Sequence, residues 1–475
     1  MKRHLLLAVL CVVLVASGCS ASKDGAATSE DGGAKSSTTA PGGATVTKFG
    51  DLDSPCGQKL DNGKAATVKA SEAGTGTDKL YLAVANERTS TIRPGLLQEM
   101  WDTSAAFVKW CNDQGGIGGL PLEVVDADAK VLQVEAAMAT ACSKSFAMVG
   151  GGWVQDQLAF SGKEGSDFHK CRMIAVPGFA VSTEFSEGNG QIQALPHPAY
   201  VQSDNWIQQL VKLYPAQMKK TTVVWGNLPS MKTNKDQLYA VGKSVDGFGA
   251  VPEVQYDAVG QPDWSLVAQQ VKDTGATALE FVGEPQNFSK LSQSLKAQGY
   301  TGVMFADANQ YDNVLIDTTG PEAVEGVISR QAFHMFEEAE QWPATQQYLD
   351  LMKNDGPPNA KIAALGLQSM SSWLFFTTAA KACAEASGGE ISRDCVLEQA
   401  HKVTSWTAGG LHAETDPSSA KPPACAMLVE VKKGKWARLD PKAKNSKATE
   451  GFFCGNLVTV EGDFGTGNVD PTRTQ

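Results

Sequence analysis

The sequence predicts an α/β protein made of two doubly wound parallel-sheet lobes. From Lys79 onward, short apolar runs alternate with longer amphipathic segments, a pattern typical of βαβ units and parallel sheets. The alternation comes in two successive series, which suggests two similar lobes. Without its first 50 residues, the chain of 475 still has about 425, which is more than one hydrophobic core usually holds.

The individual elements follow from the same pattern. A helix is expected over 95–114, where Gly115 and Gly116 end it. The strands expected in the first series are 79–86, 122–127, 146–150 and 172–176. The strands expected in the second series are 221–225, 254–256, 278–282 and 302–306. Helical sequence then follows at 341–353, 368–386 and 393–402, before a strand-rich segment that turns at Lys433-Gly434.

The N-terminus has the features of a secretion signal. Two basic residues precede an apolar run over 5–15, which is shorter than the roughly 20 residues that span a bilayer. The sequence Ala-Ser-Gly-Cys that ends at Cys19 resembles the bacterial lipobox, although Ala16 stands where Leu is usual. The resemblance implies a signal peptide over 1–18, a lipid on Cys19 and a protein held at the extracytoplasmic face of the cell membrane. The alternative is an ordinary secretion signal whose Cys19 is incidental.

The cysteines indicate an oxidising compartment. Of 10 Cys, two lie in the signal region, and the even number that remains is typical of disulfides in an exported chain. Eight Cys allow 105 pairings, so the sequence alone leaves the pairing open. Cys383 with Cys395 and Cys425 with Cys454 are neighbours along the chain. Cys142 and Cys171 each precede a strand and are expected at one edge of a sheet. The eight are Cys56, Cys111, Cys142, Cys171, Cys383, Cys395, Cys425 and Cys454.

Several functional classes are disfavoured. The net charge of -11 argues against a nucleic-acid partner, which would favour a basic face. A metal site is not expected, because there is no Cys-x-x-Cys and no close Cys/His spacing. We find no H-E-x-x-H, G-x-S-x-G or G-x-G-x-x-G motif, and Gln237 replaces the first Gly of an apparent phosphate loop that ends at 242–244. We therefore expect neither an enzyme nor a cofactor.

Four motifs together resemble a known family. They are NDQGGIGGLPLEV at 112–124, FAMVGGG at 146–152, IAVPG at 174–178 and the helix-to-strand segment at 291–302. In this order, they are similar to the type 1 solute-binding proteins of ABC transporters, the group that includes leucine, isoleucine and valine binders. The resemblance covers about 79–439. It implies two lobes joined by a three-crossing hinge, a small-molecule ligand, an ABC permease as partner and a monomer.

These inferences divide the chain into parts. The N-terminal parts are the signal peptide (1–18), the lipidated Cys with a flexible linker (19–50) and an extension (51–78), the linker being rich in Gly, Ser, Ala and Thr. Lobe 1 is expected from 79–197 and 331–403, and lobe 2 from 198–330 and 404–460. A flexible tail is expected over 461–475. The resemblance places the crossings near 196–198, 329–333 and 404–411.

The resemblance also implies the ligand site, at the strand ends that face the cleft. Gln155 stands where amino-acid binders carry a Ser or Thr for the ligand carboxylate, and Asp307 lies near the acid that meets the ligand ammonium. Trp153 and Phe179 could instead be core aromatics, and Asp307 a helix N-cap. The expected ligand-binding residues are Thr89, Trp153, Gln155, Phe179, Ala180, Ser182, Asn227, Ser230, Glu284 and Asp307.

The sequence therefore favours an extracytoplasmic receptor that captures a small amino-acid-like or amide-like solute for an ABC importer. The alternatives are a surface-anchored hydrolase and a ligand sensor on the same two-lobed scaffold. Thermal-shift screening with a solute panel separates binding from turnover.

Overall fold

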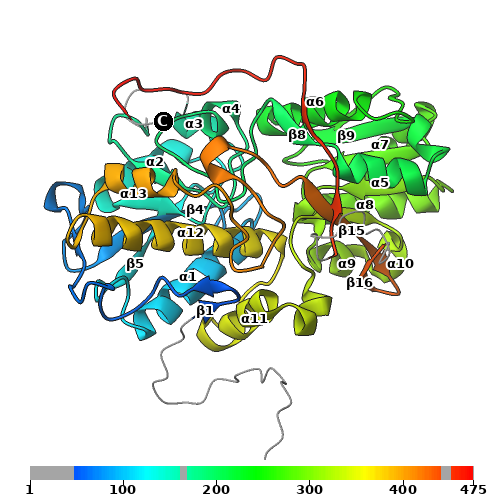
Figure 1. Cartoon of the computed structure of the whole chain (residues 1–475). Coiled ribbons are helices and arrows are strands. Elements are labelled where there is room, and N and C mark those ends of the chain that lie inside the picture. Colours follow the sequence, from blue (N-terminus) through cyan, green and yellow to red (C-terminus); the bar gives the residue numbers. More distant parts are fainter. Residues whose placement is uncertain (1–47, 161–167, 440–450, 474–475) are drawn as a thin grey trace, which may run out of the picture. The chain divides into compact units, whose positions relative to one another are not determined.

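The computed structural model describes residues 48–160, 168–439 and 451–473. The expected signal peptide, Cys19 and most of the expected linker lie outside these residues. Within the described part of the chain, no helix is both long enough and apolar enough to cross a membrane. The protein has two separate main sheets, and each forms the centre of one lobe (Figure 1).

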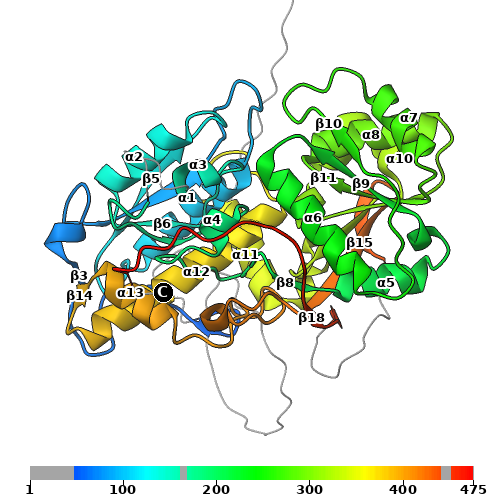
Figure 2. The same cartoon turned by 90° about the horizontal axis from the view of Figure 1, so that it is seen from above.

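Lobe 1 contains a parallel four-stranded sheet in the order β5-β4-β6-β7. The strands are β4 (Leu80–Asn86), β5 (Leu122–Asp128), β6 (Ala147–Val149) and β7 (Ile174–Val176). The side chains of β4 alternate between two cores: Leu82 and Val84 pack toward α1 and α12, whereas Ala83 and Ala85 pack toward α2. Figure 2 shows α2 and α12 on opposite sides of this sheet. The helices are α1 (Gln98–Asp113), α2 (Val134–Lys144), α3 (Gln157–Phe160), α4 (Thr183–Ser186), α11 (Pro343–Asp355), α12 (Ala364–Ala386) and α13 (Arg393–Ala400).

The N-terminal extension is part of lobe 1. Phe49, Leu60 and Val68 lie in the same core as α1 and α12. The short strand β3 (Thr67–Val68) pairs in parallel with β14 (Glu390–Ile391). The other short elements here are β1 (Lys48–Phe49), β2 (Leu52–Asp53) and η1 (Ala70–Glu72).

Lobe 2 contains a mixed sheet in the order β10-β9-β11-β12-β13-β15-β16, with β17 also paired to β15. The first five strands are parallel, and β15, β16 and β17 are antiparallel additions. The strands are β9 (Thr221–Gly226), β10 (Val254–Tyr256), β11 (Ala278–Val282), β12 (Val303–Ala306), β13 (Ile328–Gln331), β15 (Cys425–Lys432), β16 (Lys435–Arg438) and β17 (Phe453–Cys454). The sequence pattern missed β13.

Helices cover both faces of the lobe 2 sheet. On β11, Leu279 and Phe281 pack toward α7 and α8, whereas Ala278 packs in the core beneath α5 and α6. The helices are α5 (Asn205–Leu213), α6 (Pro229–Lys243), α7 (Trp264–Asp273), α8 (Pro285–Ala297), α9 (Val314–Thr319) and α10 (Pro321–Val324). The remaining elements are η2 (Gln217–Lys219), η3 (Ala308–Gln310), η4 (Phe336–Gln341), η5 (Pro417–Ser419), β8 (Val201–Ser203) and β18 (Leu457–Thr459).

The chain changes lobes at three places before its final segment. It leaves the lobe 1 core after Ala194 and reaches a lobe 2 core at Ala199, and it returns between Ile328 and Phe333. The third change lies between Leu411 and Ala413. The expected position at which lobe 2 resumes is residue 404. Apolar side chains just beyond it, such as those of Trp406, Ala408 and Leu411, pack in lobe 1.

The C-terminal segment is held by specific contacts, as far as residue 473. After β18 pairs with β8, it runs back to lobe 1, where it is drawn in red in Figure 1. His169 hydrogen-bonds the Asn468 carbonyl at 2.5 Å, and the Asn189 amide donates to the Asp470 carbonyl at 2.7 Å. The Arg473 guanidinium lies over the Phe168 ring, and this arginine is only 8% exposed. The expected flexible tail is thus instead a fourth connection between the lobes.

All eight expected disulfide cysteines are paired, which confirms this prediction. Three disulfides lie within lobe 1 and one within lobe 2. The pairs are Cys56–Cys111, Cys142–Cys171, Cys383–Cys395 and Cys425–Cys454.

Candidate functional site

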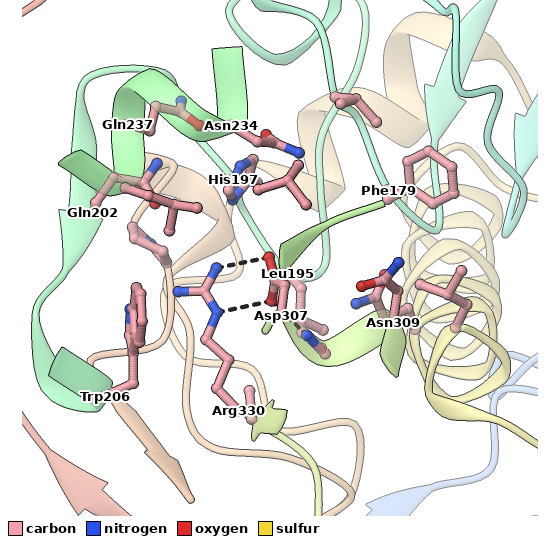
Figure 3. A pocket seen from close by; sticks show the side chains of 18 of the residues that line it. Phe179, Leu195, His197, Gln202, Trp206, Asn234, Gln237, Asp307, Asn309 and Arg330 are labelled. Carbon is pink, nitrogen blue, oxygen red and sulfur yellow. Dashed lines mark hydrogen bonds and ion pairs between the residues drawn. The ribbon is translucent and has the colours of Figure 1, made fainter. Parts of the chain in front are cut away.

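A cavity of about 280 Å³ lies between the two lobes. Lobe 1 contributes the loops that follow β6 and β7, including Val154, Phe179 and Ala180. Lobe 2 contributes the inner side of α6 and the ends of β11 and β12 (Figure 3). A buried water needs roughly 10–15 Å³ of cavity volume measured in this way. The cavity could therefore hold on the order of 20 waters or one small organic molecule.

Lobe 1 gives this cavity an aromatic wall because a glycine makes room for it. The Phe179 ring lies 2.7 Å from where a Cβ on Gly152 would be, so any larger residue there would displace the ring. Phe179 remains partly exposed and lines the cavity.

Asp307 and Arg330 form an ion pair at the edge of the cavity (Figure 3). Their strands β12 and β13 are parallel neighbours, with Ala306 opposite Ser329, so the register places the two residues side by side. Arg330 Nε donates to Asp307 Oδ1 at 2.7 Å, and Nη2 donates to Oδ2 at 2.8 Å. Burial acts to raise the pKa of Asp307, but the guanidinium outweighs it and holds that pKa well below its ordinary value.

Neighbouring groups also contact Asp307 and Arg330. The Arg330 guanidinium lies 5.1 Å from the centre of the Trp206 ring, within reach of a cation–π contact. Asp307 also accepts from the Ala308 backbone N–H at 2.6 Å and so caps η3. The N-cap alternative for Asp307 therefore holds. The Asp307 carboxylate is less available to a ligand ammonium group than expected, because it is already paired with the Arg330 guanidinium.

The opposite side of the cavity presents amides and an imidazole. Ser230, Asn234 and Gln237 lie along α6, while His197 and Gln202 belong to the segment that enters lobe 2. Burial lowers the pKa of His197, although nearby Asp307 and the side-chain amides of α6 oppose the shift. The imidazole is therefore neutral at pH 7, and this wall carries no charge.

Glu280 is an unusual residue in this setting. It lies in the middle of the central strand β11, is 2% exposed and lines the cavity. Burial raises its pKa well above the ordinary glutamate value, and the opposing effect of the Arg330 charge is smaller. The shift favours the neutral carboxyl form, which can donate a hydrogen bond.

Ion pairs connect the lobes beside the cavity. Arg93 of lobe 1 contacts Glu284 of lobe 2 at 3.4 Å, and Lys361 joins Glu99 of lobe 1 at 2.9 Å to Asp312 of lobe 2 at 2.8 Å. Burial raises the pKa of Glu284, which Arg93 partly offsets. These contacts hold the two lobes together in the arrangement described here.

Half of the expected ligand-binding residues line the cavity. They are Phe179, Ala180, Ser230, Glu284 and Asp307. All five follow parallel strands or begin the helix after one, which is where the topology of parallel sheets puts a cleft.

The other five lie elsewhere. Trp153 does not line the cavity, because its indole is 1% exposed in the lobe 1 core and donates to the Ala127 carbonyl at 2.9 Å. Gln155 donates to the Val131 carbonyl. Ser182 caps α4 by accepting from the Phe185 N–H.

Asn227 and Thr89 also serve local structure. Asn227 accepts from the Ala258 N–H at 3.0 Å, and the exposed Thr89 donates its backbone N–H to Asp128. Neither side chain lines the cavity.

Sequence reasoning missed several cavity residues. Arg330 and Trp206 carried no usable signal, since each lies within an ordinary apolar or mixed segment. Glu280 did carry one: it is a lone acid inside the apolar strand ALEFV. The spacing of Ser230, Asn234 and Gln237 was a second signal, because these positions share one helix face.

Comparison with known proteins identifies the family. A sequence model described as periplasmic binding protein matches residues 80–435. The chain belongs to this family. The expected two-lobed α/β fold is confirmed by this match and by solved structures with the same fold. The comparison with curated protein sequences finds no match.

Solved structures share the fold at low sequence identity. A fatty acid ABC transporter substrate-binding protein from Thermomonospora curvata has 14% identity and a TM-score of 0.65, over 83% of this chain and 100% of that chain. The leucine binding protein LivK from Thermotoga maritima has 16% identity and a TM-score of 0.62, over 76% and 98% of the two chains. LivJ from Streptococcus pneumoniae, in complex with isoleucine, has 15% identity and a TM-score of 0.59, over 76% and 98%.

Proposed function

We propose that this periplasmic binding protein is the extracytoplasmic receptor of an ABC importer and binds a small amide-like or amino-acid-like solute between its lobes. The observation that carries the proposal is the cavity bounded by strand-end loops of both lobes. In such a cavity a ligand contacts both lobes at once, so its binding energy favours the closed arrangement. Reversible capture followed by release to a permease is what this geometry serves.

The polar groups favour the amide-like ligand over the free amino acid. An ammonium group would have to compete with Arg330 for the Asp307 carboxylate, which already accepts two hydrogen bonds from it. An uncharged polar group avoids this competition and suits the amide side chains of α6. Phe179 and Ala180 would contact the apolar part of the ligand, while Ser230 and Glu284 would border its polar part.

The cellular location of the receptor is a further part of the proposal. We propose that a lipid on Cys19 holds the protein at the membrane surface, where a linker of about 30 residues would give a reach on the order of 30 Å. A Cys19→Ala variant should then appear in the medium or soluble fraction. Unchanged membrane association of this variant would remove the anchor.

The test of the receptor function is a solute panel. We would screen amides, ureas, amino acids, small aromatic acids and medium-chain fatty acids by thermal shift, and measure the stoichiometry of any binder by calorimetry. One-to-one binding without consumption of the solute, and loss of its uptake in a deletion strain, are expected. A solute that is consumed would show an enzyme instead, and unchanged uptake would favour a sensor.

A further inference from the structure

The inner side of α6 is unusually polar for a helix that packs on a sheet. A helix in this position normally presents a continuous apolar stripe to the strands beneath it. Here Ser230 and Gln237 are 5% and 4% exposed, and Asn234 lies between them on the same face. Leu238 and Val241 complete this face, so it combines hydrogen-bonding groups with apolar ones.

Three buried polar atoms at this helix have no hydrogen bond of good geometry among the described residues. They are Asn234 Oδ1 on α6, which lies beside the His197 side chain, Trp206 Nε1 on α5 and Glu280 Oε1 on β11. All three residues line the same cavity. A buried polar atom without a partner costs about 1–3 kcal/mol, and such atoms are rare in native proteins. Three of them around one cavity indicate that a polar group from outside the chain completes the hydrogen bonds.

The chemistry of the three atoms specifies that group. The Trp206 N–H is a donor, and so is the protonated form of the Glu280 carboxyl group, which burial favours by raising its pKa. The Asn234 oxygen is an acceptor. The nearby charges of Asp307 and Arg330 cancel, so nothing here attracts an anion or a cation. The complementary group is uncharged and carries an acceptor and a donor together.

We propose that this part of the cavity, the α6 chamber, receives the carboxamide group of the ligand. The inference rests on the proposed receptor function and narrows its ligand class. The ligand C=O accepts from Trp206 and Glu280, and its N–H donates to Asn234. The chamber is formed by Trp206, Ser230, Asn234, Gln237, Leu238 and Glu280.

Three matched probes test the chamber: phenylacetamide, phenylacetate and phenethylamine. They share one ring and chain and differ only in the uncharged, anionic or cationic end group. Isothermal titration of the full folded chain at pH 7 should show phenylacetamide binding at least about tenfold tighter than either ion. Similar affinities for all three probes, or no saturable binding of phenylacetamide, would overturn the proposal.

Variants assign the effect to the chamber. Asn234→Leu removes the acceptor and should weaken phenylacetamide about tenfold or more, whereas Thr233→Leu, one residue away on α6 and outside the cavity, should not. Glu280→Leu should weaken it similarly, and Glu280→Gln, which keeps a donor, should restore binding. Circular dichroism confirms that each variant is folded. Equal loss in Thr233→Leu, or none in Asn234→Leu, would contradict the assignment.

The same experiments separate this inference from the receptor function. If another solute of the panel binds and Asn234→Leu leaves its affinity unchanged, the chamber assignment fails and the receptor function stands. If no solute binds and uptake is normal in the deletion strain, the receptor function itself fails.

Discussion

Glu87 offers a sharp test of the buried electrostatics of this protein. It follows β4 and is 0% exposed, and no side chain of the described residues hydrogen-bonds its carboxyl oxygens. Burial raises its pKa from 4.5 to about 8, and the nearby Val154 N–H only partly opposes this. The folded state therefore keeps Glu87 protonated at pH 7, while the unfolded chain ionises it near pH 4.3.

The sign of the pH dependence follows from this difference. Because the folded-state pKa is above the unfolded one, the stability from this group is fully present below about pH 4.3 and is lost as the pH rises toward 8. Each pH unit in this window costs about 1.4 kcal/mol. Between pH 5 and pH 7.5 the wild type should thus lose roughly 3 kcal/mol that a non-ionisable residue would keep.

The perturbation is Glu87→Gln, and the assay is urea unfolding followed by tryptophan fluorescence at pH 5 and pH 7.5. Relative to wild type, the variant should gain about 3 kcal/mol between the two pH values, or a midpoint shift of about 1 M urea for a chain of this size. The exposed Glu322→Gln is the control and should change stability by less than about 0.5 kcal/mol at either pH. A pH-independent difference between Glu87→Gln and wild type would refute the reasoning.

Three other variants test contacts described above. Arg330→Ala should lower the free energy of unfolding by about 1–3 kcal/mol, less than for a fully buried ion pair, because 46% of the Asp307 side chain is accessible. In urea unfolding, the double variant with Asp307→Ala should lose less stability than the sum of the two single variants. Trp153→Phe should lower stability by about 1–2 kcal/mol through the lost hydrogen bond while leaving ligand affinity unchanged in calorimetry, and weakened binding would return this residue to the site. Truncation after residue 460 removes the buried Arg473 and should lower the melting temperature by a few degrees. It should also increase the radius of gyration of the unliganded protein in X-ray scattering. An identical scattering curve would show that the segment does not restrain the lobes.

Much of the fold could be predicted because parallel strands have a local signature. Buried runs such as 147–149 are apolar throughout, and the helices between the strands show their own period. Strand β13 was missed because three of its four residues, ISRQ, are polar. The C-terminal segment escaped for a different reason. Its Gly- and Thr-rich sequence is typical of a flexible tail, and its order depends on partners about 300 positions away, such as Met173 for Arg473.

The site was predictable only to the extent that topology determines it. Asp307 and Ser230 could be placed because the ends of parallel strands meet at one edge of a sheet. The partnership of Asp307 with Arg330 depends on the register of β12 against β13, which no local pattern reveals. Trp153 misled because a Gly-flanked aromatic after a strand looks exposed. The glycine beside it in fact makes room for the Phe179 ring.

The position of the Cys56–Cys111 bond has a mechanical consequence. The bond closes a covalent ring over a sequence separation of 55, and this ring contains β4, the strand that pairs with both β5 and β6. A load applied to the N-terminal end passes from Cys56 directly into the end of α1, bypassing the strand. The residues before Cys56 can therefore extend under such a load, while β4 lies outside the covalent path that carries it.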